Sequence, residues 1–144
     1  MKKFVRILAL CLAALMLTVS LVACTAPAKN PDKAVEALEK NGYSAKKFDS
    51  GLSLAAFKAL GYDLTAIVSA SNLTTDDADN PIIEHVTIYY FADKENAKKA
   101  MAEVEKYAND DKEAEETEDS NWIAPKQSGS IIYYGTKAAV KAAK

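Results

Sequence analysis

The chain has 144 residues, with 18 basic and 20 acidic side chains, and Arg6 is its only arginine. Because the planar guanidinium group is suited to binding phosphate at two points, a slightly acidic chain with one arginine is not expected to bind nucleic acid. Its two cysteines, Cys11 and Cys24, fall within the first 24 residues, so the remainder has no thiol for a disulfide, a zinc site or nucleophilic catalysis.

The N-terminal segment has the pattern of an export signal. Three cations, Lys2, Lys3 and Arg6, precede an apolar run from residue 7 to residue 22, and a small residue stands before Cys24. A positively charged start, an apolar run and a small-residue cleavage site are typical of signal peptides. The apolar run is shorter than the stretch of about 20 residues that usually spans a membrane, so an uncleaved anchor is the less favoured interpretation. A plain secretory signal is the other alternative.

The four residues Leu21-Val22-Ala23-Cys24 resemble the lipobox of bacterial lipoproteins. The resemblance implies that residues 1–23 are removed, that the Cys24 thiol carries a diacylglyceryl group, and that the new amino terminus is acylated, for example with palmitate. Two or three acyl chains hold a protein firmly, whereas one chain holds it only marginally. The implied location is the extracytoplasmic side of the cell membrane, with residues 24–30 as a lipidated tether. Loss of the signal would leave 15 lysines against 20 acidic residues, a net charge of −5.

Residues 31–144 are enough for one domain of common size, and no repeat or linker interrupts them. Capping residues and apolar periodicity predict its helices and strands. In chain order these are helix 31–41, strand 43–48, helix 52–60, strand 64–71, strand 82–91, helix 94–108, strand 122–124, strand 130–134 and helix 137–143. Loops are predicted over 72–81 and over 109–121, where seven of the residues are acidic.

This order of elements is typical of an α+β domain. We expect two layers, a mostly antiparallel sheet of about five strands with helices packed on one face. The strand over 82–91 alternates, so Val86, Ile88 and Tyr90 share a face that we expect to be core. Tyr89 is then expected to point outward.

The sequence lacks the common catalytic and metal-binding motifs. Its five glycines are too far apart for a G-x-G-x-x-G or Walker loop. His85 is the only histidine, which excludes a multi-histidine metal site within one chain. An EF-hand loop counted from Asp77 would need a glycine at 82 and a glutamate at 88, and both positions are isoleucine. We predict no catalytic residue, metal site or cofactor, although the two predicted loops leave weak cation binding open.

One motif keeps a hydrolase as an alternative. Gly51-Leu52-Ser53-Leu54-Ala55 is similar to a nucleophile elbow, with His85 downstream as a possible base. An α/β-hydrolase, however, has a glycine in place of Ala55 and a larger parallel sheet. Ser53 is therefore interpreted as a residue at the start of a helix.

Aromatic side chains give the best candidate for a binding face, formed by Tyr89, Trp122, Tyr133 and Tyr134. Strand alternation places one of Tyr133 and Tyr134 outward, and tyrosine is favoured at interfaces. The predicted function is a lipid-anchored, noncatalytic accessory or binding module at the cell envelope, whose partner is an envelope protein or a glycan. A small ligand-binding component of a transport system is the alternative, and a Ser hydrolase ranks third.

Overall fold

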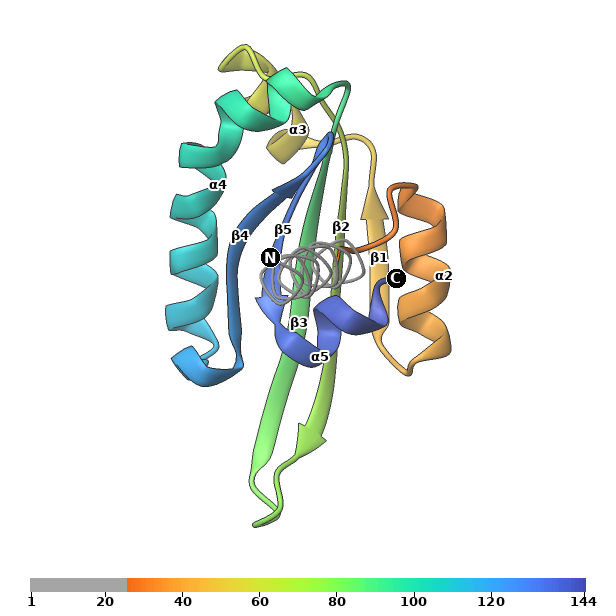
Figure 1. Cartoon of the computed structure of the whole chain (residues 1–144), viewed down its shortest axis with the longest axis vertical. Coiled ribbons are helices and arrows are strands. Elements are labelled where there is room, and N and C mark those ends of the chain that lie inside the picture. Colours follow the sequence, from red (N-terminus) through yellow and green to blue (C-terminus); the bar gives the residue numbers. More distant parts are fainter. Residues whose placement is uncertain (1–25) are drawn as a thin grey trace, which may run out of the picture.

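The structure is a computed structural model that describes residues 26–144, so the predicted export signal, the lipobox-like residues and Cys24 lie outside the described residues. Its elements are α2 (Pro31–Lys40), β1 (Ser44–Phe48), α3 (Leu52–Ala59), β2 (Leu64–Thr75), β3 (Pro81–Phe91), α4 (Lys94–Ala114), a 3₁₀ turn (Asp119–Asn121), β4 (Trp122–Ser128), β5 (Ile131–Thr136) and α5 (Lys137–Ala142). The strands form one sheet in the order β1-β2-β3-β5-β4, with neighbouring strands antiparallel (Figure 1). The predicted α+β class with an antiparallel sheet of five strands is confirmed. No helix within the described range combines the length and the apolar character needed to cross a bilayer.

The helices cover both faces of the sheet, not one face as the order of elements predicts. Val68 and Ile88 pack in a core cluster with α2 and α5. Tyr89, their neighbour on the other face, packs in a second cluster with α3 and α4. The reason is that β3 is buried at each position from His85 to Phe91 and β5 is buried throughout, so each face of the inner strands needs helices of its own.

Side-chain caps explain where two of the helices begin. The Asn30 carboxamide oxygen accepts hydrogen bonds from the backbone N–H groups of Asp32 and Lys33, at 2.9 and 3.2 Å. Asp93 caps α4 in the same way, by accepting from the N–H of Asn96 at 2.7 Å. Both caps satisfy N–H groups that the first turn of a helix leaves without partners. Both were predicted from the sequence, and both are confirmed.

The acidic segment 109–121, predicted as a loop, is partly helical. α4 continues to Ala114, and the 3₁₀ turn covers Asp119–Asn121. A hydrogen bond connects this end of α4 to β5 of the sheet, because the Asp111 carboxylate accepts from the buried Tyr134 hydroxyl at 2.6 Å. Most of the other carboxylates in the segment remain exposed, so the helix continues without burying like charges together.

The segment before α2 is fixed to the domain. The Ala28 N–H donates to the carbonyl of Ala143 at 2.8 Å, and the Tyr90 hydroxyl donates to the carbonyl of Ala28 at 2.9 Å. Ala26 and Ala28 also pack against the core on the α2 and α5 side. The tether predicted over 24–30 is therefore bound from Ala26 onward, because the domain offers this segment both an apolar surface and hydrogen-bond partners.

Gly135 allows β5 to approach β3 closely. Val86 and Gly135 are register partners in these two strands. The φ angle of Gly135 is +144°, and a Cβ added there would lie 2.2 Å from the carbonyl oxygen of His85. Only glycine adopts this backbone conformation without strain, and only glycine leaves room for the neighbouring carbonyl.

Gly135→Ala is expected to lower the free energy of unfolding by about 3 kcal/mol, the upper end of the usual cost of overpacking. Gly42→Ala is the matched control, because Gly42 has a φ of +84° but no atom within 4 Å of an added Cβ. The control should show only the backbone strain, about 1 kcal/mol. Urea denaturation measures both losses, and equal losses would contradict the close approach of the two strands.

Candidate functional site

The structure buries the tyrosines that the sequence predicts as a binding face. Tyr89 is 5% exposed and Tyr134 is 1% exposed, both on the side of the sheet that α3 and α4 cover. Tyr133 is 4% exposed on the opposite side. Trp122 alone is partly exposed. The predicted face is therefore corrected: these four side chains lie on two sides of the sheet, and helices on both sides cover the tyrosines.

Aromatic rings instead form a chain of contacts inside the domain. Ring centroids lie 5.5 Å apart for Phe57 and Tyr89, and 6.1 Å apart for Tyr89 and Tyr134. The chain continues from Tyr134 to Trp122 at 5.8 Å, and from Trp122 to His85 at 5.3 Å. Burial raises the pKa of Tyr89 to about 12 and also raises the pKa of Tyr134. Both phenols stay protonated at neutral pH, so they serve as packing groups and hydrogen-bond donors.

His85 ends this chain of rings. It is 8% exposed, and neither ring nitrogen has a hydrogen-bond partner among the residues that the structure describes. Burial lowers the pKa of the imidazole, and the carboxylates of Glu115 and Asp111 oppose that shift. Ser53 is exposed on α3 and does not bond to either nitrogen. The nucleophile and base of the hydrolase alternative are therefore not paired.

The buried, neutral His85 predicts a loss of stability in mild acid. Its pKa in the folded chain lies below the ordinary value of 6.5, so the unfolded chain takes up a proton first as the pH falls. This contribution to stability is constant well above pH 6.5 and is lost as the pH falls from there toward the lowered folded pKa. The urea midpoint should therefore drop between about pH 7.5 and about pH 5.5, a window above the titration of ordinary carboxyl groups.

His85→Leu is the variant that isolates this effect. Leucine fills the buried position beside Trp122 with an apolar side chain and has no group that takes up a proton. Its urea midpoint should change less with pH over the same window. If the variant and the original chain lost stability equally, the proton uptake would belong to another group.

Asp76 shapes the turn between β2 and β3. Its carboxylate accepts hydrogen bonds from the backbone N–H groups of Ala78 and Asn80, each at 2.8 Å, and from the Asn80 side-chain amide at 3.0 Å. These hydrogen bonds, led by the one from the Asn80 side chain, lower the pKa of Asp76. Across residues 26–144, no three His, Cys, Asp or Glu side chains are grouped to hold a metal ion.

β2 and β3 extend beyond the other strands as a two-stranded ribbon, residues 72–85. The pairing of β1 ends at Ser71 of β2, and the pairing of β5 ends at Val86 of β3. Beyond these points, within the described part of the chain, the two strands pair only with each other, and Figure 1 shows the ribbon projecting from the body of the domain. Leu73 and Ile83 are register partners on the ribbon, and they are 69% and 44% exposed. Both lie on the sheet face that carries Tyr89.

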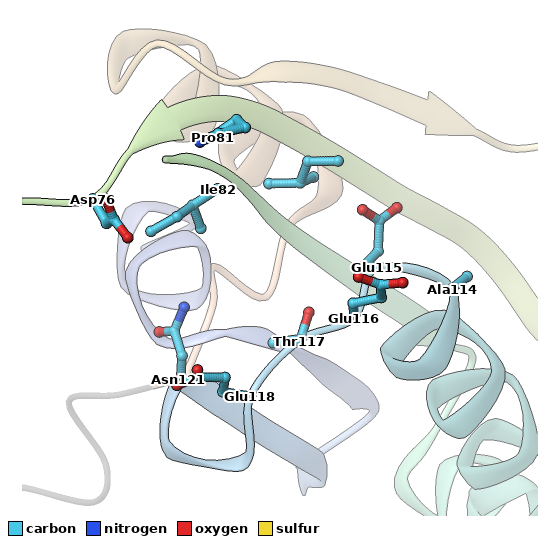
Figure 2. A pocket seen from close by; sticks show the side chains of 10 residues that line it. Asp76, Pro81, Ile82, Ala114, Glu115, Glu116, Thr117, Glu118 and Asn121 are labelled. Carbon is cyan, nitrogen blue, oxygen red and sulfur yellow. The ribbon is translucent and has the colours of Figure 1, made fainter. Parts of the chain in front are cut away.

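A cleft of about 690 Å³ lies between the ribbon and the segment that follows α4 (Figure 2). The ribbon contributes Pro81, Ile82 and Ile83, which give the cleft an apolar side. Four carboxylate residues also line it: Asp76, Glu115, Glu116 and Glu118. None of the described residues that line the cleft is a lysine or an arginine. In Figure 2 the carboxylate of Asp76 lies at one end of the cleft and those of Glu115 and Glu116 at the other.

The sequence prediction missed the ribbon because it ended the strand at Ser71 and assigned Leu73 to a polar loop. In the structure β2 runs to Thr75 and β3 begins at Pro81, which leaves a turn of residues 76–80. The threonines before the turn are β-branched and favour strands, and they are the signal that could have extended β2.

No protein-family model, curated protein or solved structure matches this chain. A functional assignment therefore rests on the geometry of the described residues and on the export signal predicted from the sequence before them.

Proposed function

We propose that this chain is a lipid-anchored, noncatalytic binding module of the cell envelope, which binds its partner with the ribbon and the cleft beside it. The observation that carries the proposal is the pair Leu73 and Ile83, two apolar side chains exposed across from each other on a ribbon that no further strand of residues 26–144 flanks. Covering exposed apolar surface is favourable, and an apolar patch beside a cleft is typical of a binding site.

The residues that line the cleft indicate which chemical groups the partner presents. Its carboxylates favour a positively charged group, and its Ile82 and Ile83 side favours an apolar one. A polypeptide segment with both cationic and apolar side chains meets both conditions. A glycan is the weaker candidate, because the tyrosines that would present rings to it are buried.

The proposed location of the module in the cell rests on the lipobox-like residues that end at Cys24. A lipid there would hold the domain on the extracytoplasmic side of the cell membrane, where envelope proteins are the available partners. A small ligand-binding component of a transport system has less support, since such sites usually enclose most of the ligand and this cleft is open to solvent.

Leu73→Ser tests the proposal directly. The change removes one of the two exposed apolar side chains, and losing a central interface residue costs about 2 kcal/mol or more, roughly thirtyfold in affinity. Stability should change by no more than about 0.5 kcal/mol, because Leu73 lies on the surface. The measurement is quantitative affinity capture from native membranes, with the full-length chain and its variant compared by mass spectrometry.

Leu60→Ser is the matched control. Leu60 follows α3, is 56% exposed, and belongs with Phe48 and Leu52 to the apolar side chains exposed near that helix. Its replacement should leave the captured proteins at their original amounts. If Leu60→Ser removed the partner and Leu73→Ser did not, the binding surface would lie at α3, and the assignment to the ribbon would be wrong.

A further inference from the structure

The N-terminal segment leaves the domain at the end of α5. Ala28 is hydrogen-bonded to Ala143, just beyond α5, and Pro27 is buried. Ala26 packs against the core on the same side. Only two peptide units, at most about 7 Å of chain, separate Ala26 from Cys24. A lipid on Cys24 would therefore enter the bilayer close to the α5 side of the sheet.

The outer surface of α5 is basic. Its inner residues Ala139, Val140 and Ala143 are buried against the sheet. Two exposed lysines, Lys137 and Lys141, lie four residues apart on the outside of the helix, and a third exposed lysine, Lys144, follows just beyond its end. The segment 137–144 contains no acidic residue. Within the described part of the chain, none of these lysines takes part in an ion pair.

The other helix on this side of the sheet does not cancel that charge. α2 contains three acidic residues and two lysines, Lys33 and Lys40. Asp32 pairs with Lys47 of β1 at 2.6 Å and Glu36 pairs with Lys40 at 2.7 Å. The third acid, Glu39, is balanced in number by Lys33, so α2 and Lys47 together carry no net charge. The dense acidic segment 109–121 follows from α4, which packs on the opposite face of the sheet. The α5 side is therefore basic where the chain exits, and the α4 side is acidic.

We infer that α5 lies on an anionic phospholipid surface, with Lys137, Lys141 and Lys144 as its contacts to the headgroups. This inference rests on the proposed lipid at Cys24. Each lysine near an anionic surface strengthens binding about fivefold, and a basic patch beside an acyl anchor is a common second membrane signal. The occupant is a lipid surface and not an acidic protein, because the short chain to Cys24 leaves little room between α5 and the bilayer. The sheet then lies with its α4 side, and with it Leu73 and Ile83, turned away from the membrane.

The test places one fluorescent label on each side of the mature, lipidated chain, residues 24–144, which lacks Cys11. The chain has no cysteine after Cys24, so Ala138→Cys on α5 and Ala102→Cys on α4 each introduce a single free thiol. Both alanines are exposed, which makes the two variants a matched pair. The chains are reconstituted into vesicles that contain phosphatidylglycerol and headgroup-linked quenchers, or into purely phosphatidylcholine vesicles with the same quenchers.

The label at position 138 should be quenched strongly in the anionic vesicles, and the label at position 102 should not. The combined changes Lys137→Gln, Lys141→Gln and Lys144→Gln should reduce the quenching at position 138 to its level in phosphatidylcholine vesicles. Equal quenching of the two labels, with the chain still retained on the vesicles, would overturn the orientation while leaving the anchor intact. A separate Cys24→Ala chain that remained on the vesicles as fully as the original would overturn the lipid anchor and, with it, this inference.

Discussion

Burial of the inner strands on both faces is the constraint on which the rest of the structure depends. β3 is buried from His85 to Phe91, and β5 is buried along its whole length. An antiparallel sheet can leave one face in water, but these strands carry apolar or aromatic side chains on both faces. Two pairs of helices are therefore needed, and Gly135 lets the central strands approach closely beneath them. The middle of the sheet is consequently unavailable for binding.

The part of the sheet that remains available for binding is the part that the helices do not cover. The ribbon extends past β1 and β5, and the end of α4 stops beside it to form the cleft. The buried aromatic chain supports this region from within, since Tyr134 is hydrogen-bonded to Asp111 near the end of α4 and Trp122 packs on His85 near the base of the ribbon. The aromatic chain thus ends at His85, the last residue of the ribbon, and the cleft lining contains none of the tyrosines.

The charged side chains of the domain are also distributed unequally between the α4 side and the α5 side of the sheet. The carboxylates gather around the end of α4 and the cleft, whereas α5 presents lysines beside the exit of the N-terminal segment. An anionic membrane would attract the α5 side and repel the α4 side. A module oriented in this way would present its ribbon and cleft to the envelope, so the proposed anchor and the proposed binding surface are compatible.

The sequence predicted most of the elements but not the site. Caps at Asn30 and Asp93 marked the helix starts, because a local hydrogen bond suffices to define them. Whether Tyr89 points into a core or into water depends on whether α4 packs over its face, which strand alternation cannot reveal. The ribbon exists because β1 and β5 stop pairing before β2 and β3 end. The alternation of side chains within β2 does not show where its neighbouring strands stop.

Site-specific photocrosslinking in intact cells distinguishes the ribbon from α3 as the surface that contacts the partner, with a photoreactive residue placed in the full-length chain at Leu73 or, separately, at Leu60. We expect a discrete crosslinked envelope protein from position 73 and none from position 60, because the proposed contact with the partner is made by the ribbon. Crosslinks from position 60 alone, or crosslinks from position 73 to lipid alone, would contradict it.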